Sequence, residues 1–259
     1  VPAPSSMPWL PALTPGITPF TQPKTTTIRE RPLYEIYAVL SEDETSLSCI
    51  QMLTYVNTSE DALYEILLNI YPNAFLSEDV VTEQEFNTVF GRKFSPGGID
   101  FKRVSLNGTP AYYTYKNERK TQLSVPLLVE LQPRETAELL LEYTVRLPRA
   151  NHRFGIGDTA VMLGNCFPIA AVYEEGWRSD GFYPIGDPFY SDTADYKLAV
   201  ELPNDFLLAS TGNVELISSQ GNTKTHYITA LGTRDFALAY SDDYTEATIN
   251  GDRYEVHSY

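Results

Sequence analysis

The sequence AELLLEYTVRL, residues 137–147, alternates between two kinds of side chain. Its odd-numbered positions are all apolar or aromatic, whereas its even-numbered positions are polar or charged, with Leu140 as the exception. Such a period of two predicts a β-strand that buries one face and exposes the other. Residues 132–135, which contain Pro133, predict the turn that precedes this strand.

Similar strand patterns occur along most of the chain. Apolar runs at Leu33–Leu40 and Leu47–Val56 are separated by acidic residues, which predicts two strands joined by a turn. Asn107-Gly108 predicts a tight hairpin, because both central positions of that turn type require positive φ angles. Further strand patterns occupy residues 62–71, 101–106, 111–115, 196–201, 206–210, 214–217, 225–228, 236–240 and 253–258.

Many short strands separated by turn signals predict an all-β protein, either a β-sandwich or an open barrel. One short helix is expected near residues 78–90, where a helical apolar spacing follows Ser77 and ends before Gly91. The segment Asn151–Asp195 is rich in glycine, proline and aromatic residues and lacks alternation. We expect it to form a long, partly irregular excursion. Within it, the stretch Leu163–Trp177 is interpreted either as a packed crossover within the sandwich or as a wall presented to a neighbouring domain or ligand.

The amino-terminal residues 1–32 have a different composition. Seven prolines lie among serine and threonine in the first 23 positions, a composition that favours extended polyproline conformations and cannot form a core. This segment resembles the tether that follows a cleaved signal or a lipid-anchored cysteine in exported proteins. The sequence therefore predicts a linker or tether at residues 1–32, a single β domain at residues 33–259, and an extracellular or cell-surface-anchored bacterial protein, secreted or a lipoprotein.

The charge balance excludes several partners. The chain carries 34 acidic and 19 basic residues, a net charge of −15, which repels phosphate backbones and anionic lipid headgroups. No apolar run approaches the roughly 20 residues that a membrane helix requires. We therefore expect no nucleic-acid binding and no direct membrane insertion by this chain.

The two cysteines, Cys49 and Cys166, permit one disulfide, but their spacing does not decide whether it forms. Cys49 lies within the apolar alternation of an expected strand, and small apolar thiols are usually buried. We interpret both residues as buried free thiols.

No catalytic constellation is evident in the sequence. The three histidines, His152, His226 and His257, are far apart, and none belongs to a His-Glu-x-x-His pair on a helix. No Gly-x-Ser-x-Gly motif occurs, and Gly155–Ala160 lacks the βαβ context that a dinucleotide-binding loop needs. We therefore predict no catalytic residue and no metal ligand in this chain.

A calcium site is a minority alternative. Asp187, Asp192 and Asp195 lie close together in sequence and could gather oxygen ligands. Their spacing is not that of an EF-hand loop, and surface carboxylates are expected in a chain of this charge. We interpret them as solvated acidic residues.

Several short segments, in their order and spacing, carry a family resemblance. These segments are Tyr34–Ile36, Asn69–Phe75, Val125–Leu127, Leu163–Ile169, Ala171–Tyr173, Gly176-Trp177, Gly186–Ser191, Ala194–Tyr196, Ala209–Gly212 and Arg234–Ala237. With them the chain resembles the amino-terminal domain of the gluzincin aminopeptidases, the aminopeptidase N and leukotriene A hydrolase class, in a divergent bacterial form. The resemblance spans about residues 34–259.

The resemblance implies a saddle-shaped antiparallel β-sandwich followed by a thermolysin-like catalytic domain. In this family that following domain holds zinc through His-Glu-x-x-His and a later glutamate, and a Gly-x-Met-Glu-Asn segment binds the peptide amino terminus. This chain contains neither motif, and it ends about where the catalytic domain is expected to begin. The resemblance thus implies zinc in a catalytic domain beyond this chain and no cofactor within it.

One contribution to substrate binding is implied for this domain. Typical members carry a Gln or Glu in a Cys-[Glu/Gln]-Ala turn that helps to hold the free amine of the substrate. The corresponding region here is Met162–Cys166, which contains no carboxylate. The candidate substrate-binding residues are therefore Asn165 and its neighbours Gly164 and Cys166, although an ammonium group binds best to an anionic partner.

Together these observations predict a non-catalytic domain of a zinc-aminopeptidase-like protein, which packs on a following catalytic domain and forms one wall of the peptide cleft. The alternative is a free-standing extracellular module that binds protein or peptide and has no enzymatic activity. A self-sufficient hydrolase would need a nucleophile or metal site that the sequence does not contain.

Overall fold

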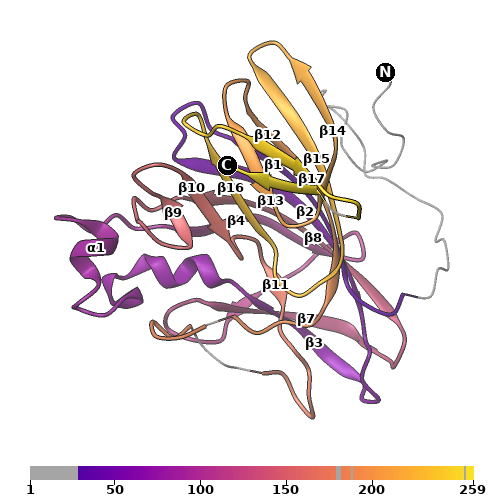
Figure 1. Ribbon diagram of the computed structural model, residues 1–259. Helices are drawn as coiled ribbons and strands as arrows, with labels where there is room; N and C mark the ends of the chain where they lie inside the picture. The colour runs from indigo at the N-terminus through magenta and orange to yellow at the C-terminus, as the bar shows by residue number, and fades with distance from the viewer. Residues whose placement is uncertain (1–28, 179–181, 188, 254) are drawn as a thin grey trace.

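The computed structural model describes residues 29–178, 182–187, 189–253 and 255–259 (Figure 1). Most of these residues lie in β-strands, which confirms the predicted all-β class. The largest sheet has eight strands in the order β14-β15-β12-β1-β2-β8-β4-β5. Their bounds are β14 (Asn213–Gln220), β15 (Thr223–Thr233), β12 (Ala194–Pro203), β1 (Leu33–Leu40), β2 (Ser46–Val56), β8 (Thr136–Arg146), β4 (Gly98–Leu106) and β5 (Thr109–Pro110).

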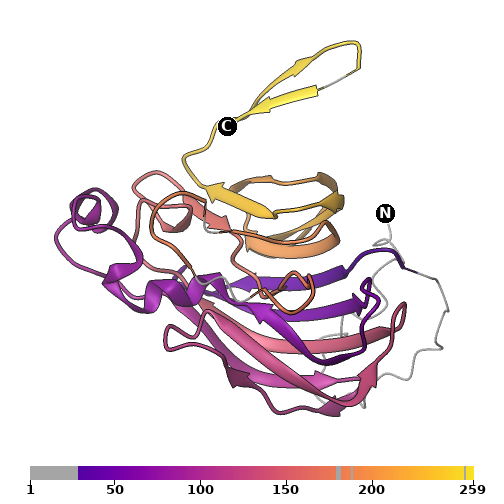
Figure 2. The same cartoon turned by 90° about the horizontal axis from the view of Figure 1, so that it is seen from below.

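Two four-stranded sheets and one isolated hairpin complete the described strands. One sheet has the order β13-β16-β10-β9 and the other the order β11-β3-β7-β6. The hairpin, β17 paired with β18, stands apart from the other sheets (Figure 2). The bounds are β13 (Leu207–Ser210), β16 (Ala237–Ser241), β10 (Val161–Gly164), β9 (Phe154–Ile156), β11 (Ile169–Ala170), β3 (Leu63–Asn69), β7 (Gln122–Leu131), β6 (Thr114–Tyr115), β17 (Ala247–Asn250) and β18 (Glu255–Ser258).

The strand β8 shows the burial that its sequence predicts. Its five odd-numbered residues, 137 to 145, are all buried, and its even-numbered residues are exposed or partly exposed. The buried face joins one continuous cluster of side chains that includes residues of the eight-stranded sheet and of both four-stranded sheets, such as Ile36, Ile66 and Leu238. The sheets therefore share one core, as expected for a sandwich.

The excursion at Asn151–Asp195 links the two four-stranded sheets. Strand β10 pairs with β16 in one sheet, and β11, which begins five residues after β10 ends, pairs with β3 in the other. The segment between them lies against the large sheet, because the Gln51 amide donates to the Pro168 carbonyl at 2.7 Å. The Ala170 N–H donates to the Tyr34 hydroxyl at 2.8 Å. The prediction of a packed crossover at this segment is confirmed.

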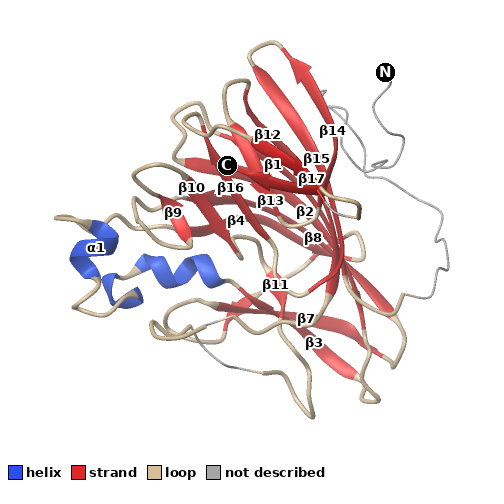
Figure 3. Ribbon diagram, in the orientation of Figure 1, coloured by secondary structure: helices blue, strands red, loops and turns tan. Residues whose placement is uncertain are grey.

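The helix expected near residues 78–90 is present but divided (Figure 3). Two 3₁₀ turns, Tyr71–Leu76 and Glu78–Val80, precede the α-helix α1 (Phe86–Phe90), which ends at Gly91 with a φ of 64°. The Ser77 side chain makes no capping hydrogen bond. Instead the Thr82 N–H donates to the Glu85 carboxylate at 3.2 Å, a contact of the capping-box type that marks the start of the helical turn, and Gly91 ends it.

The hairpin at Asn107-Gly108 was predicted from the sequence, whereas the parallel pairing of β1 with β12 was not. Asn107 and Gly108 have φ angles of 49° and 78° and join β4 to β5, so the predicted hairpin is confirmed. By contrast, β1 and β12 pair in parallel, whereas the other strand pairs are antiparallel. A parallel neighbour requires a long connection, and here about 150 residues separate the two strands.

The beginning of the described chain is fastened to this parallel pair. Arg29 and Arg31 both contact the Asp195 carboxylate, at 3.0 and 2.7 Å, and the Gly232 N–H donates to it at 3.0 Å. The rest of the predicted tether, residues 1–28, lies outside the described residues. Among the described helices, none has the length and apolar character needed to cross a bilayer.

Candidate functional site

The three candidate binding residues form a tight turn directly after β10. The Gly164 N–H donates to the Arg153 carbonyl at 2.7 Å, and the Asn165 N–H donates to the Phe236 carbonyl at 3.1 Å. Asn165 has a φ of 48°, a left-handed conformation that asparagine tolerates better than most residues. The sequence therefore identified a real turn, and the turn is held by backbone contacts on both sides.

Two of the three turn residues are buried, so the turn presents little side-chain surface for binding a ligand. Asn165 is only 6% exposed, and Cys166 is fully buried. Burial raises the pKa of the Cys166 thiol, so this cysteine remains protonated and is a poor nucleophile. Cys49 is also a buried free thiol, which confirms the interpretation of both cysteines.

Gly164 is required by the close approach of a neighbouring strand. A Cβ atom at this position would lie 2.9 Å from the Arg153 carbonyl oxygen, a backbone atom that cannot move aside easily. We expect Gly164→Ala to lower the free energy of unfolding by about 1–3 kcal/mol in urea titrations. Met162→Ala, on the same strand with a partly exposed side chain, should cost less than about 1 kcal/mol. An equal loss in both variants would show that the close approach does not constrain the turn.

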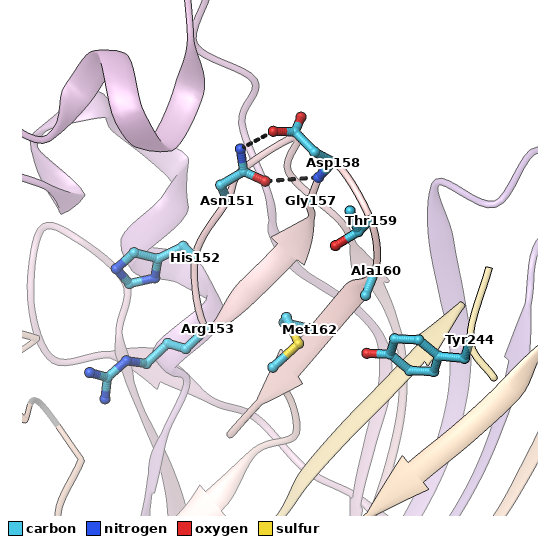
Figure 4. Close-up of a pocket in the computed structure, with 9 residues that line it drawn as sticks. All are labelled: Asn151, His152, Arg153, Gly157, Asp158, Thr159, Ala160, Met162 and Tyr244. Carbon is cyan, nitrogen blue, oxygen red and sulfur yellow. Dashed lines mark hydrogen bonds between the residues drawn. The ribbon is translucent and has the colours of Figure 1, made fainter. Parts of the chain in front are cut away.

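A shallow hollow of about 390 Å³ lies along β10 and the segments on either side of β9, and none of the three candidate residues lines it (Figure 4). Met162 forms part of its floor, because it projects to the side of β10 opposite the buried Leu163. The turn between β9 and β10 forms one rim, where the Asn151 amide donates to the Asp158 carboxylate at 2.8 Å and the Asp158 N–H donates to the Asn151 side-chain oxygen. The remaining lining residues are His152, Arg153, Gly157, Thr159, Ala160 and Tyr244.

The hollow holds no evident acid–base pair. Burial lowers the pKa of His152, and the adjacent Arg153 guanidinium lowers it further, so this imidazole is neutral at pH 7. Its ring packs edge-on against Phe75 at 5.4 Å. The other two histidines lie elsewhere, His226 within β15 and His257 on β18. In the described ranges, no three His, Cys, Asp or Glu side chains are grouped so that they could hold a metal ion.

The three aspartates considered for calcium have separate surroundings. Asp195 is engaged by Arg29 and Arg31, as described above, and Asp187 pairs with Arg153 at 3.3 Å. Burial raises the pKa of Asp192. Since two of the three carboxylates are already paired with guanidinium groups, the calcium hypothesis is not supported for the part of the chain that the structure describes.

Arg153 connects the turn to an exposed apolar segment, a role that the sequence did not reveal. Its carbonyl accepts from Gly164, while its guanidinium pairs with Asp187 and lies 5.2 Å from the centre of the Phe189 ring. The Phe189 ring in turn packs edge-on against Tyr71 at 4.8 Å. These contacts fix the described residues of 182–190 near the turn.

We call the exposed apolar side chains of this segment the apolar rim: Tyr183, Ile185 and Tyr190, which are 59%, 75% and 38% exposed. Soluble proteins rarely expose several large apolar side chains on one short segment, and where they do, the segment commonly forms a contact surface. The Tyr190 hydroxyl donates to Glu174 at 3.2 Å, which holds its ring at the surface. A composition rich in aromatics and glycine was the only sequence signal for this feature.

Comparisons with known proteins give a match in structure alone. No protein-family model and no curated protein sequence matches the chain. Solved structures of M1 zinc metallopeptidases do match. One is a two-domain M1 zinc metallopeptidase variant bound to L-arginine, with a TM-score of 0.53, 16% identity, and coverage of 87% of this chain and 45% of that one.

Two further matches come from Deinococcus radiodurans. Its M1 zinc metallopeptidase has a TM-score of 0.53 and 16% identity, covering 88% of this chain and 47% of that one. A variant bound to a Tyr-Ser-Ala substrate has a TM-score of 0.51 and 17% identity, covering 87% and 45%. This chain thus spans less than half the length of the structures that it matches. The resemblance to the gluzincin metallopeptidases is confirmed in fold: the chain has the β fold of one part of an M1 zinc metallopeptidase.

Proposed function

We propose that this chain is the non-catalytic amino-terminal domain of a bacterial zinc-aminopeptidase-like protein. It packs on a following catalytic domain and forms one wall of the peptide cleft, and the whole protein is secreted or anchored at the cell surface. The observation that carries this proposal is the asymmetric coverage of the structural matches. Nearly nine-tenths of this chain corresponds to less than half of each metallopeptidase.

The surface around the turn supports this role. The apolar rim supplies exposed tyrosine and isoleucine side chains, and aromatic residues are enriched at protein interfaces. The turn at Gly164–Cys166 lies beside it, through the contacts of Arg153. A domain that docks on the apolar rim would therefore bring its own surface next to Asn165.

The chemistry of the proposed enzyme belongs to the following domain. Zinc bound there would activate water for attack on the peptide bond. The residues of this chain would only orient the substrate: the Asn165 amide, largely buried in this chain alone, would have to be reached through the turn, and it carries no charge with which to neutralise an ammonium group. We therefore propose a minor contribution of this turn to substrate affinity.

Asn165→Ala in the full-length protein should raise the KM for peptide amides about threefold and leave kcat nearly unchanged. The reason is that a single neutral hydrogen bond contributes about 0.5–1.5 kcal/mol to binding. Steady-state kinetics on a panel of aminoacyl amides measures both constants. Met162→Ala is the matched control, since Met162 lies on β10 just before the turn, is not one of the candidate substrate-binding residues, and should leave KM unaltered. An unchanged KM for Asn165→Ala would remove this residue from the substrate site.

Zinc content and peptidase activity of the native protein test the proposal as a whole. We expect about one zinc per polypeptide and hydrolysis of peptide amides by the full-length protein, and neither property in the isolated 259-residue chain. A native protein that binds no zinc and cleaves none of a broad panel of amides and esters would favour the free-standing binding module instead.

A further inference from the structure

Two consecutive apolar side chains of β7, Leu128 and Val129, are among the most exposed apolar side chains of the described residues. Leu128 is 88% exposed and Val129 is 80% exposed. In a regular strand, consecutive side chains point to opposite faces, so a strand that packs on a core should bury one of the two. Because both are exposed, the strand departs locally from regular pairing.

A bulge between β3 and β7, which lie side by side in Figure 1, accounts for this exposure. Between two regular pairs, Tyr64 of β3 faces residues 127–130 of β7. A bulge bends the strand that carries the extra residues and re-aims its side chains. Tyr64 is itself 69% exposed. We call Tyr64, Leu128 and Val129 the bulge patch.

Carboxylates surround the bulge patch. The Tyr64 hydroxyl and the Gln132 amide both donate to the Glu130 carboxylate, the amide at 2.8 Å. The Asp61 carboxylate, in the turn before β3, accepts from the Tyr173 hydroxyl at 3.2 Å. All three donors are neutral groups, so these contacts do not balance the charge of either carboxylate. The bulge patch is therefore an apolar surface in a negative electrostatic field.

This combination of apolar area and negative charge selects among the surfaces that could cover the patch. An anionic membrane is repelled by the carboxylates. A second copy of this chain has a net charge of −15 and would bring the same carboxylates together. A partner with lysine or arginine beside its own apolar side chains suits both features, because it covers apolar surface and places a cation near Glu130.

We propose that the bulge patch binds a separate protein, through a segment in which apolar side chains stand next to lysine or arginine. The apolar side chains pack on Leu128, Val129 and the Tyr64 ring, and the cation pairs with Glu130 at the margin. Tyrosine suits such a position, because it combines a large apolar ring with a polar tip and is enriched at protein interfaces. The bulge patch shares no residue with the apolar rim, so the inference does not depend on the proposed function.

Binding of a synthetic peptide to the full-length protein tests the proposal. In the probe, leucine and phenylalanine alternate with lysine, and fluorescein on the amino terminus blocks aminopeptidase cleavage and reports binding by anisotropy. The double variant Leu128→Ser/Val129→Ser should weaken binding at least about tenfold, because it removes two apolar contacts. Equal affinity of the wild type and the double variant would overturn the proposal, since the peptide would then bind by charge alone.

Two further variants separate the apolar and the charged parts of the contact. Ile217→Ser is the matched control, because it removes a 52% exposed apolar side chain from β14 without a change of charge, and it should leave the affinity unaltered. Glu130→Gln should weaken binding about threefold at low ionic strength and by less at about 0.5 M salt, where exposed charges are screened. An unchanged affinity for Glu130→Gln at low ionic strength would overturn the assignment of a basic partner.

The accessibility of the bulge patch in the full-length protein gives a second readout. Leu128→Cys introduces one reactive thiol, since Cys49 and Cys166 are both buried. We expect this thiol to react with a maleimide as fast as a small free thiol does. Strong protection would show that the patch is covered within the polypeptide itself and would overturn the proposal. A dimer that Leu128→Ser/Val129→Ser converts to a monomer, measured by light scattering, would assign the patch to a second copy and would also overturn it.

Discussion

Replacing Gln51 with leucine is expected to lower the free energy of unfolding by about 2–5 kcal/mol. The Gln51 side chain is fully buried on β2, where it accepts from the Tyr143 hydroxyl at 2.7 Å and donates to the Pro168 carbonyl at 2.7 Å. Leucine has a similar volume but removes both of these buried hydrogen bonds. Each unsatisfied group costs about 1–3 kcal/mol. Urea unfolding of the wild-type and variant chains measures the loss.

Two further variants distinguish this hydrogen-bond network from a general packing effect. Gln132→Leu removes an exposed glutamine from a turn and should cost less than about 0.5 kcal/mol. Tyr143→Phe combined with Gln51→Leu should cost less than the sum of the two single losses, because one substitution already breaks their shared bond. A loss below about 1 kcal/mol for Gln51→Leu would show that the crossover is not fastened through this amide.

Acidification below pH 6.5 is expected to destabilise the chain through His226. This residue on β15 is 3% exposed, and neither ring nitrogen has a hydrogen-bond partner among the described residues. Burial lowers the pKa of His226 from 6.5 to about 4, and Lys224 adds to the effect. The unfolded state therefore takes up the proton first, so stability is complete above pH 6.5 and falls as the pH drops toward 4, by about 2–3 kcal/mol.

Removing the imidazole should remove this part of the pH dependence. His226→Leu leaves no partner unsatisfied, so we expect unchanged or higher stability at pH 7 and a clear gain over the wild type at pH 4.5. Urea unfolding at both pH values measures the difference. His257→Leu serves as the comparison: Glu246 and Glu255 raise the pKa of His257, so its loss should not remove the fall in stability on acidification, as the loss of His226 should. Parallel pH profiles for wild type and His226→Leu would contradict this assignment.

The fold was largely predictable because alternation is a local property of the sequence. Strand β8 shows the predicted pattern of burial, and Asn107-Gly108 forms the predicted turn. The parallel pairing of β1 with β12 was not predictable, since no local pattern specifies which distant strand lies beside another. The start of α1 is marked by the Thr82–Glu85 contact, a capping signal present in the sequence that the apolar spacing alone did not reveal.

The candidate site was less predictable, because burial is a property of the tertiary structure. Asn165 was selected as a polar residue within the resembling segment, but the structure places it in a left-handed turn with little exposure. Arg153 joins that turn to the apolar rim through one carbonyl and one guanidinium group. No sequence pattern distinguishes it from an ordinary surface arginine. Gln51 likewise occupies an expected apolar position of β2, where the crossover supplies its partners.

The most direct test of the central claim is the intact mass of the native protein, with peptide mapping beyond Tyr259. The account predicts a product about twice as long as this chain, since each matched metallopeptidase is covered over only 45–47% of its length. Its additional peptides should include His-Glu-x-x-His. A native product that ends near Tyr259 would contradict the account and identify the chain as a module without a catalytic domain.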